Sequence, residues 1–153
     1  YRWMDFGSSY LPSDMNAAYL YAQLEIADRI NEKRLSDFDR YMEAFRDLEE
    51  KERVELPYIP EYCRINGHMF YLKCRDEEER SRLIKHLAGR DILAVFHYIP
   101  LHTAPAGEKF GRFHGEDRYT TKESERLLRL PMYYALTKED QDRVIAAVRE
   151  FYG

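Results

Sequence analysis

The sequence has little cysteine and no long apolar run, and each shortage excludes a class of protein. Its two cysteines, Cys63 and Cys74, fit no zinc-binding spacing. We therefore expect both to be reduced thiols of a cytosolic protein. No apolar run approaches the length of a transmembrane helix, and no signal-peptide pattern is present. We therefore expect a cytoplasmic protein without a membrane partner.

An excess of positive charge is also missing. The chain has 24 basic and 28 acidic residues, a net charge of −4, and both signs are mixed along it. Because no stripe of Lys and Arg stands out, we expect no nucleic-acid partner. A hydrophobic share of 44% and a length of 153 residues are typical of one globular domain with a single core.

Common catalytic motifs are absent as well. The sequence contains no phosphate-binding P-loop, no GxSxG elbow and no HExxH motif. Three histidines, His97, His102 and His114, surround one proline turn, at spacings of five and twelve residues. Paired metal ligands usually stand two apart on a strand, or three to four apart on a helix. We therefore expect no metal in this protein.

The N-terminal region is unusually rich in aromatic residues. The chain starts at Tyr1 without a methionine, so we expect a processed product or part of a longer protein. Chain ends are usually polar and poorly ordered. Here six aromatic side chains lie within 21 residues, which predicts a segment made to be buried: Tyr1, Trp3, Phe6, Tyr10, Tyr19 and Tyr21.

A helical pattern runs from Met15 almost to Glu50 without Pro or Gly, and Ser13 is a suitable N-cap. An unbroken helix of roughly 35 residues would be about 50 Å long. A compact domain of this size has a diameter of about 40 Å. The helix is therefore expected to outgrow its own domain. The alternative is a break near Asn31–Arg34, where the apolar stripe changes phase. The helix would then fold its own apolar stripe back on the sheet.

The remainder predicts a small α+β sandwich. A strand is expected at 68–74, and a second, well-buried strand at 91–98. Three helices are predicted by capping-box patterns at their N-termini: one from Asp76–Glu79 to Gly89, one from Thr120–Glu123 to a point before Pro131, and one from Thr137–Asp140 to the end. A short strand is expected between the last two helices.

The loop at 97–119 is the best candidate for a binding site, because long ordered loops in compact domains are often functional. His97 and Tyr98 are neighbours at the end of a predicted strand, so their side chains should point to opposite sides. One of them would meet a ligand while the other packs. His102 is a further candidate ligand contact, although an ordinary surface or core role stays open for each residue.

Two blocks of sequence carry a resemblance to a known family. Residues 2–34 read RWMDFGSSYLPSDMNAAYLYAQLEIADRINEKR, and residues 97–131 read HYIPLHTAPAGEKFGRFHGEDRYTTKESERLLRLP. Together they strongly resemble the C-terminal part of the sugar aminotransferases of the DegT/DnrJ/EryC1/StrS family. The second block is the more specific of the two, and the resemblance covers nearly the whole chain.

The resemblance implies the small C-terminal domain of a fold type I aminotransferase. Residues 1–50 would form an N-terminal segment and long connecting helix. Residues 51–153 would form a small α+β domain with a mostly antiparallel sheet covered by helices. The implied partners are a large domain that binds pyridoxal phosphate, absent from this chain, and the second subunit of a homodimer.

The implied reaction is amino transfer from L-glutamate to C4 of dTDP-4-dehydro-6-deoxy-D-glucose, a step in the synthesis of enterobacterial common antigen. Pyridoxal 5'-phosphate would serve as the electron sink. None of the seven lysines matches the family's Schiff-base motif, so no catalytic residue is expected in this chain and the chain alone should be inactive.

The resemblance also implies individual site residues. Many members carry a G-x-N-x-R element whose Asn reaches the cofactor phosphate of the neighbouring subunit. Ser9 stands at the Asn position here and Leu11 at the Arg position, so Ser9 becomes the candidate cofactor contact. The family's HY…H element matches His97, Tyr98 and His102, which are therefore candidates for binding the sugar nucleotide.

Two other classes of function compete with this interpretation. One is a stand-alone α+β ligand-binding or regulatory module that never meets the cofactor; the aromatic N-terminus and the helix length disfavour it. The other is a metallohydrolase that uses the three histidines, and their spacing disfavours it.

Overall fold

A computed structural model describes residues 10–153 of the chain. Two helices begin it, α1 (Asp14–Leu24) and α2 (Ala27–Glu50). Ser13 caps α1 as predicted, accepting a hydrogen bond of 3.3 Å from the Asn16 N–H. The prediction of an unbroken helix is wrong, because the chain leaves helical geometry at Ile26 (φ −119°, ψ 15°). The break therefore lies five residues before Asn31.

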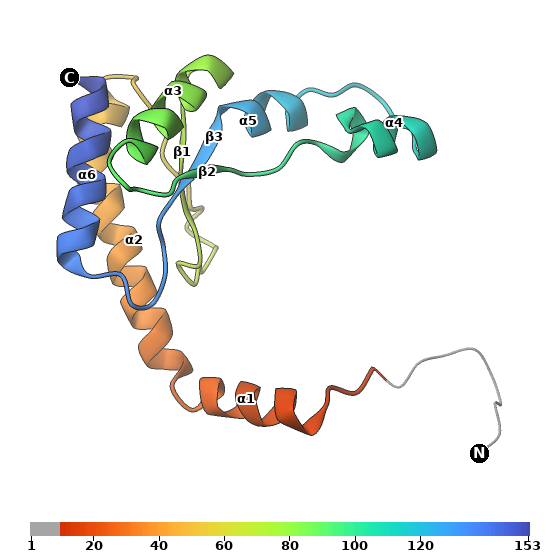
Figure 1. The fold of residues 1–153 in the computed structure, drawn as a ribbon, viewed down its shortest axis with the longest axis vertical. Helices are drawn as coiled ribbons and strands as arrows, with labels where there is room; N and C mark the ends of the chain where they lie inside the picture. Colours follow the sequence, from red (N-terminus) through yellow and green to blue (C-terminus); the bar gives the residue numbers. More distant parts are fainter. Residues whose placement is uncertain (1–9) are drawn as a thin grey trace.

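The two helices separate because tertiary packing holds only one of them. In Figure 1, α1 turns away from α2 and lies apart from the rest of the molecule. No residue of α1 is buried, whereas α2 buries five of its residues: Asp37, Phe38, Tyr41, Phe45 and Leu48. Isolated helices of this length are marginal in water, so nothing among the described residues holds α1 in line with α2.

The sheet has three antiparallel strands in the order β1-β3-β2: β1 (Phe70–Lys73), β3 (Leu127–Leu130) and β2 (Val95–Phe96). Its register pairs Phe70 with Leu130, and Val95 with Arg129. Since side chains alternate along a strand, Phe70 and Leu130 point into the core. Arg129 points to the opposite face, where its neighbours on the adjacent strands are partly buried or exposed.

Of the three helices predicted from capping boxes, two have the predicted cap. Asp76 caps α3 (Glu77–Ala88) by accepting a 2.8 Å hydrogen bond from the Glu79 N–H. Thr137 caps α6 (Lys138–Tyr152) by accepting a 3.0 Å bond from the Asp140 N–H. Both helices cover the core face of the sheet together with α2. An N-cap residue that directly precedes an amphipathic pattern can thus be recognised from the sequence.

The third helix and the second strand differ from the prediction. α5 (Thr120–Arg126) has no cap from Thr120, and Leu127–Leu130 continues as β3 instead of extending the helix to Pro131. The strand predicted at 91–98 contracts to Val95–Phe96 and is exposed. An apolar run alone does not distinguish a buried strand from the edge of a sheet, and here the run forms an edge.

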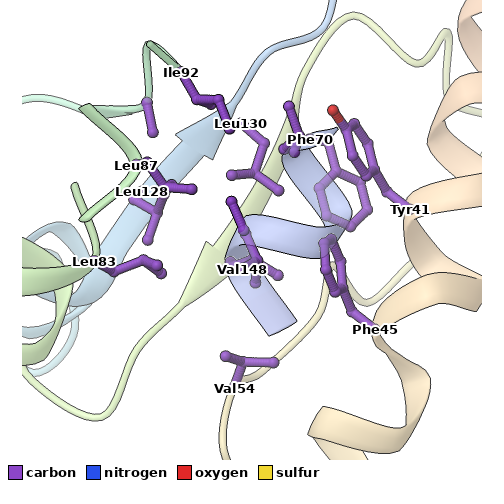
Figure 2. Close-up of a cluster of buried hydrophobic side chains, with 14 of the residues drawn as sticks. Tyr41, Phe45, Val54, Phe70, Leu83, Leu87, Ile92, Leu128, Leu130 and Val148 are labelled. Carbon is purple, nitrogen blue, oxygen red and sulfur yellow. The ribbon is translucent and has the colours of Figure 1, made fainter. Parts of the chain in front are cut away.

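The core lies between the sheet and the helices α2, α3 and α6 (Figure 2). The ring of Phe70 is its centre, with centroids 4.9 Å from Tyr41, 5.2 Å from Phe38 and 6.2 Å from Phe45. Leu83, Leu87, Leu128 and Val148 fill the rest and are fully buried. This single core fits an α+β domain, and no helix of the described part is long and apolar enough to span a bilayer.

Candidate functional site

The segment after β2 is ordered by short helical turns instead of forming an open loop. A 3-10 turn, η1 (Leu101–Thr103), is followed by α4 (Pro105–Phe110), and both project from the side of the sheet opposite α2 (Figure 1). Gly107 allows this packing, because a Cβ at this position would stand 1.6 Å from the Leu101 carbonyl oxygen. A side chain cannot fit at 107 without moving η1.

His102 is held by the residues that start α5. Its Nε2 donates to the Asp117 carboxylate at 2.8 Å, and its ring lies 4.3 Å from the Phe113 ring between centroids. The same carboxylate accepts from the Thr120 N–H and the Thr121 hydroxyl. The Thr121 hydroxyl, with the His102 ring and the backbone N–H groups, lowers the pKa of Asp117. The Asp117 carboxylate, and not the Thr120 side chain, therefore accepts from the first N–H groups of α5, although Tyr119 is the N-cap residue.

His97 and Tyr98 differ in exposure, but the prediction that their side chains point to opposite sides is wrong, because both line one hollow and their rings touch beyond the last residue of β2. His97 is half-buried, and its Nδ1 has no hydrogen-bond partner among residues 10–153. Tyr98 is 69% exposed, and its ring meets the His97 ring edge-on at 4.9 Å. The Arg129 guanidinium carbon lies 5.9 Å from the centre of the Tyr98 ring. Tyr98 therefore connects the end of β2 to the open face of the sheet.

Two hollows border this segment. One, of about 560 Å³, is lined by His97, Tyr98 and residues of α5. The other, of about 440 Å³, lies between α3 and α5, with Arg80 and the Phe96 ring in its wall. Small-molecule sites are typically concave, largely apolar and of this size. The structure thus brings His97 and Tyr98 to a hollow that a ligand can enter.

The other sequence candidates are not gathered at these hollows. His102 lies nearby, but its Nε2 is engaged by Asp117. His114 is exposed, and no group of three or more potential metal ligands occurs within residues 10–153. Ser9, the candidate cofactor contact, lies outside the described residues.

Sequence reasoning missed two residues of this region, Asp117 and Arg129. Asp117 precedes Thr120 by three residues, which is the spacing of an N-cap acceptor, so the signal was present. It competed with the capping-box pattern that begins at Thr120. Arg129 carried no signal, because a strand was not predicted at 127–130 and its neighbours across the sheet were unknown.

Solved structures define the class of fold. TlmJ, an aminotransferase from Streptoalloteichus hindustanus, matches with a TM-score of 0.82 at 23% identity over 97% of this chain and 39% of TlmJ, a similarity of fold alone. DesV of S. venezuelae, solved in complex with a ketimine intermediate, matches with a TM-score of 0.80 at 26% identity over 94% of this chain and 40% of DesV. The architecture is thus one found in aminotransferases, as the predicted fold class requires.

Sequence comparison identifies the family. The DegT/DnrJ/EryC1/StrS aminotransferase family matches residues 1–149, and the chain belongs to this family. A relative from Micromonospora megalomicea subsp. nigra, named dTDP-3-amino-3,4,6-trideoxy-alpha-D-glucose transaminase, is 32% identical over 139 residues. These residues are 90% of this chain and 36% of the relative, so the chain spans about a third of the relative's length.

Proposed function

We propose that this chain is the small domain of a pyridoxal-phosphate-dependent sugar aminotransferase. The full protein would move an amino group from L-glutamate to C4 of dTDP-4-dehydro-6-deoxy-D-glucose, giving dTDP-4-amino-4,6-dideoxy-D-galactose for enterobacterial common antigen. This is the reaction of dTDP-4-amino-4,6-dideoxygalactose transaminase, a member of the family. The observation that carries the proposal is the family match together with the His97–Tyr98 segment at a hollow of ligand size.

The division of labour within the protein is part of this proposal. Residues 1–50 would form the connecting segment and 51–153 the small domain, with the cofactor domain outside this sequence. The exposed helix α1 supports the division, because it has no buried residue of its own and presents Met15, Tyr19 and Leu24 to solvent. A helix that is apolar on all sides is usually buried. We infer that α1 packs on the large, cofactor-binding domains of a homodimer. This homodimer would be cytoplasmic.

The described residues do not fit the covalent site of the cofactor. A Schiff-base lysine is normally desolvated, which lowers its pKa. Five of the seven lysines here are exposed. Lys33 is ion-paired with Asp37, and Lys73 is paired with Glu123 at 2.7 Å, a contact that raises its pKa. We therefore assign no cofactor step to these lysines.

The chain's own contribution would be to bind and orient the nucleotide sugar. Tyr98 offers an exposed ring for stacking on a base or sugar, and half-buried His97 has a shielded ring nitrogen without a hydrogen-bond partner among residues 10–153. His102 stiffens the segment through Asp117 and can turn its second ring nitrogen toward the ligand. Correct placement of the substrate by such groups is itself a large part of catalysis.

An amino-transfer assay tests this function. The protein that contains this chain, incubated with L-glutamate and the 4-keto sugar nucleotide, should form 2-oxoglutarate and an amino sugar in equal amounts. The chain of residues 1–153 alone, incubated with pyridoxal phosphate, should form neither and should show no absorption band of an internal aldimine. Saturable turnover by the isolated chain would show that the division proposed above is wrong.

A second candidate function differs in the position of attack. The relative from Micromonospora is named for a 3-amino sugar, so amino transfer to C3 of a dTDP-linked sugar is the alternative. A stand-alone ligand-binding module is the alternative of another class. It would bind a nucleotide sugar through the same hollow and transfer nothing.

A further inference from the structure

His102 is held in one orientation by the residues around it. Its Nε2 lies 2.8 Å from the Asp117 carboxylate and 3.4 Å from the Thr121 hydroxyl, and its ring lies 4.3 Å from the Phe113 ring between centroids. A half-turn of the imidazole would place a carbon against the carboxylate and lose the hydrogen bond. The protein therefore sets the direction of each ring nitrogen, although the side chain stays 19% exposed.

The carboxylate of Asp117 acts as an acceptor only. It receives the Thr121 hydroxyl at 2.5 Å and the N–H groups of Thr120 and Thr121 at 2.9 and 3.3 Å. The bond from the Thr121 hydroxyl, followed by those from His102 and the two N–H groups, holds the pKa of Asp117 below its usual range. An ionised carboxylate carries no hydrogen. The hydrogen between the two side chains therefore belongs to Nε2 of His102.

Nδ1, the second ring nitrogen of His102, is consequently an acceptor. A neutral imidazole has one N–H group and one lone pair, and the bond made by one nitrogen decides the state of the other. An aspartate fixes the histidine tautomer in the same way in Ser-His-Asp triads. Within residues 10–153, Nδ1 of His102 makes no hydrogen bond, and unlike Nδ1 of His97 it is not shielded from solvent. Its lone pair is open to a donor from outside the described part of the chain.

We propose that Asp117 is a positioning residue that keeps the hydrogen of His102 on Nε2, so that Nδ1 accepts a hydrogen bond from a hydroxyl group of the ligand. A phosphate or keto oxygen offers only lone pairs and would repel this nitrogen. His102 would thus select a sugar hydroxyl, and not the diphosphate or the reacting carbonyl. The tautomer rests on the geometry of Asp117 and His102 alone; the assignment of the hydroxyl to a nucleotide sugar rests on the proposed function.

The position of the hydrogen can be measured directly by NMR. The chain of residues 1–153 is labelled with ¹⁵N in its histidines and observed at pH 8, where an imidazole with the ordinary pKa of about 6.5 is neutral. The signals of His102 are identified by their loss in His102→Ala. They should show a protonated Nε2 and an unprotonated Nδ1.

Asp117→Asn is the variant that should reverse the tautomer with little change in shape. Its amide oxygen can accept from the Thr120 N–H as the carboxylate does, and its amide N–H groups then face Nε2 of His102. The hydrogen of His102 should move to Nδ1. Asp117→Ser still offers an acceptor to α5 but is too short to reach His102. It should give a mixture of tautomers, and it covers the case in which the Asn variant does not fold.

A neighbouring acid supplies the matched control. Glu116 is exposed and pairs with Arg118, and Glu116→Gln makes the same change of charge one residue away from Asp117. Its spectrum and its kinetics should be those of the wild type.

Kinetics of the protein that contains this chain test the consequence for binding. Asp117→Asn should lower kcat/KM for the nucleotide sugar about tenfold, because two donors would then face each other. The KM for L-glutamate and the urea midpoint should stay near the wild-type values. In the wild type, the 2-deoxy or the 3-deoxy form of the sugar should lose a similar factor. The same form should lose nothing further in Asp117→Asn.

Several results would overturn the assignment. They are a hydrogen on Nδ1, or on both ring nitrogens, in the wild type; a reversed tautomer in Asp117→Asn without loss of kcat/KM; or deoxy sugars that react as well as the parent sugar. A purely structural role of Asp117 would lower the urea midpoint in Asp117→Asn and leave the tautomer unchanged.

The two proposals fail separately. Amino transfer by a protein whose His102 carries its hydrogen on Nδ1 contradicts only the role of Asp117. The expected tautomer, reversed in Asp117→Asn, in a protein that transfers no amino group contradicts only the proposed reaction.

Discussion

The His102 imidazole and the Asp117 carboxylate are joined by a hydrogen bond of 2.8 Å across 15 residues of chain, and the carboxylate also caps α5. One side chain thus connects the η1 turn to the first turn of the next helix. Because the Asp117 carboxylate is bonded to Nε2 of His102, Nδ1 of the same ring is the atom that would contact the ligand in the role proposed above. The same contact gives His102 a structural role, which an experiment on this residue has to separate from binding.

His102→Ala in the full protein should lower kcat/KM for the nucleotide sugar about tenfold to hundredfold, since removing one partner of a buried hydrogen bond costs about 1–3 kcal/mol. The internal aldimine absorption should persist. Asp117→Asn keeps an acceptor for the α5 N–H groups, and its urea midpoint reports the structural part of the contact. His114→Ala is the matched control, because His114 is exposed and should behave like the wild type. Wild-type kinetics in His102→Ala would remove it from the binding site.

The α6–α2 contact should make stability depend on pH in the acid range. Arg149 donates two hydrogen bonds to Asp47, at 2.7 and 2.8 Å, and this contact lowers the Asp47 pKa from 3.8 to about 2. A depressed carboxyl pKa adds stability above the unfolded value, and this contribution disappears as the pH falls from about 4 to about 2. Arg149→Gln should therefore lower the urea midpoint at pH 6 and have little effect at pH 2. Arg46→Gln, which removes an exposed, ion-paired arginine of α2, should change neither; an equal loss at both pH values in Arg149→Gln would contradict the linkage.

The aromatic centre of the core should dominate stability. Phe70→Ala removes a fully buried ring packed on Phe38, Tyr41 and Phe45, and should destabilise the chain by about 3–5 kcal/mol. Phe70→Leu should lose less and gives a measurable value if the Ala variant does not fold. Phe110 is 79% exposed, so Phe110→Ala should stay within about 0.5 kcal/mol of the wild type in urea unfolding. Comparable losses at 70 and 110 would show that the core is placed wrongly.

Local signals predicted much of this fold, and contacts between distant segments explain the rest. Asp76 and Thr137 are visible caps because each acceptor and its N–H target lie three residues apart. The break at Ile26 was not predictable, since neither Pro nor Gly marks it and its cause is the lack of packing on α1. For the candidate site, the sequence singled out the segment of His97 and Tyr98, and its role in binding stays a prediction. Arg129 was not singled out, because its position depends on the pairing of β3 with β2.

The isolated chain should associate through α1. Met15, Tyr19 and Leu24 are 84%, 72% and 62% exposed, and large apolar patches rarely stay exposed on soluble monomers. Light scattering at high concentration should show dimers or larger species. Replacing Met15 and Tyr19 with Lys should shift the chain to monomers, whereas Lys at exposed Ser36 and Glu43 of α2 should not. A clean monomer of the wild-type chain would show that α1 has no affinity for another copy.

The most direct test of the proposed function follows the transferred nitrogen. The protein that contains this chain is incubated with ¹⁵N-labelled L-glutamate and dTDP-4-dehydro-6-deoxy-D-glucose, and the product is examined by NMR for the carbon that bears ¹⁵N. We predict one labelled amino group at C4 in the galacto configuration. Label at C3 of a dTDP sugar would favour the alternative substrate. Absence of label from the sugar, with the nucleotide sugar bound unchanged, would contradict the account and identify a binding module instead.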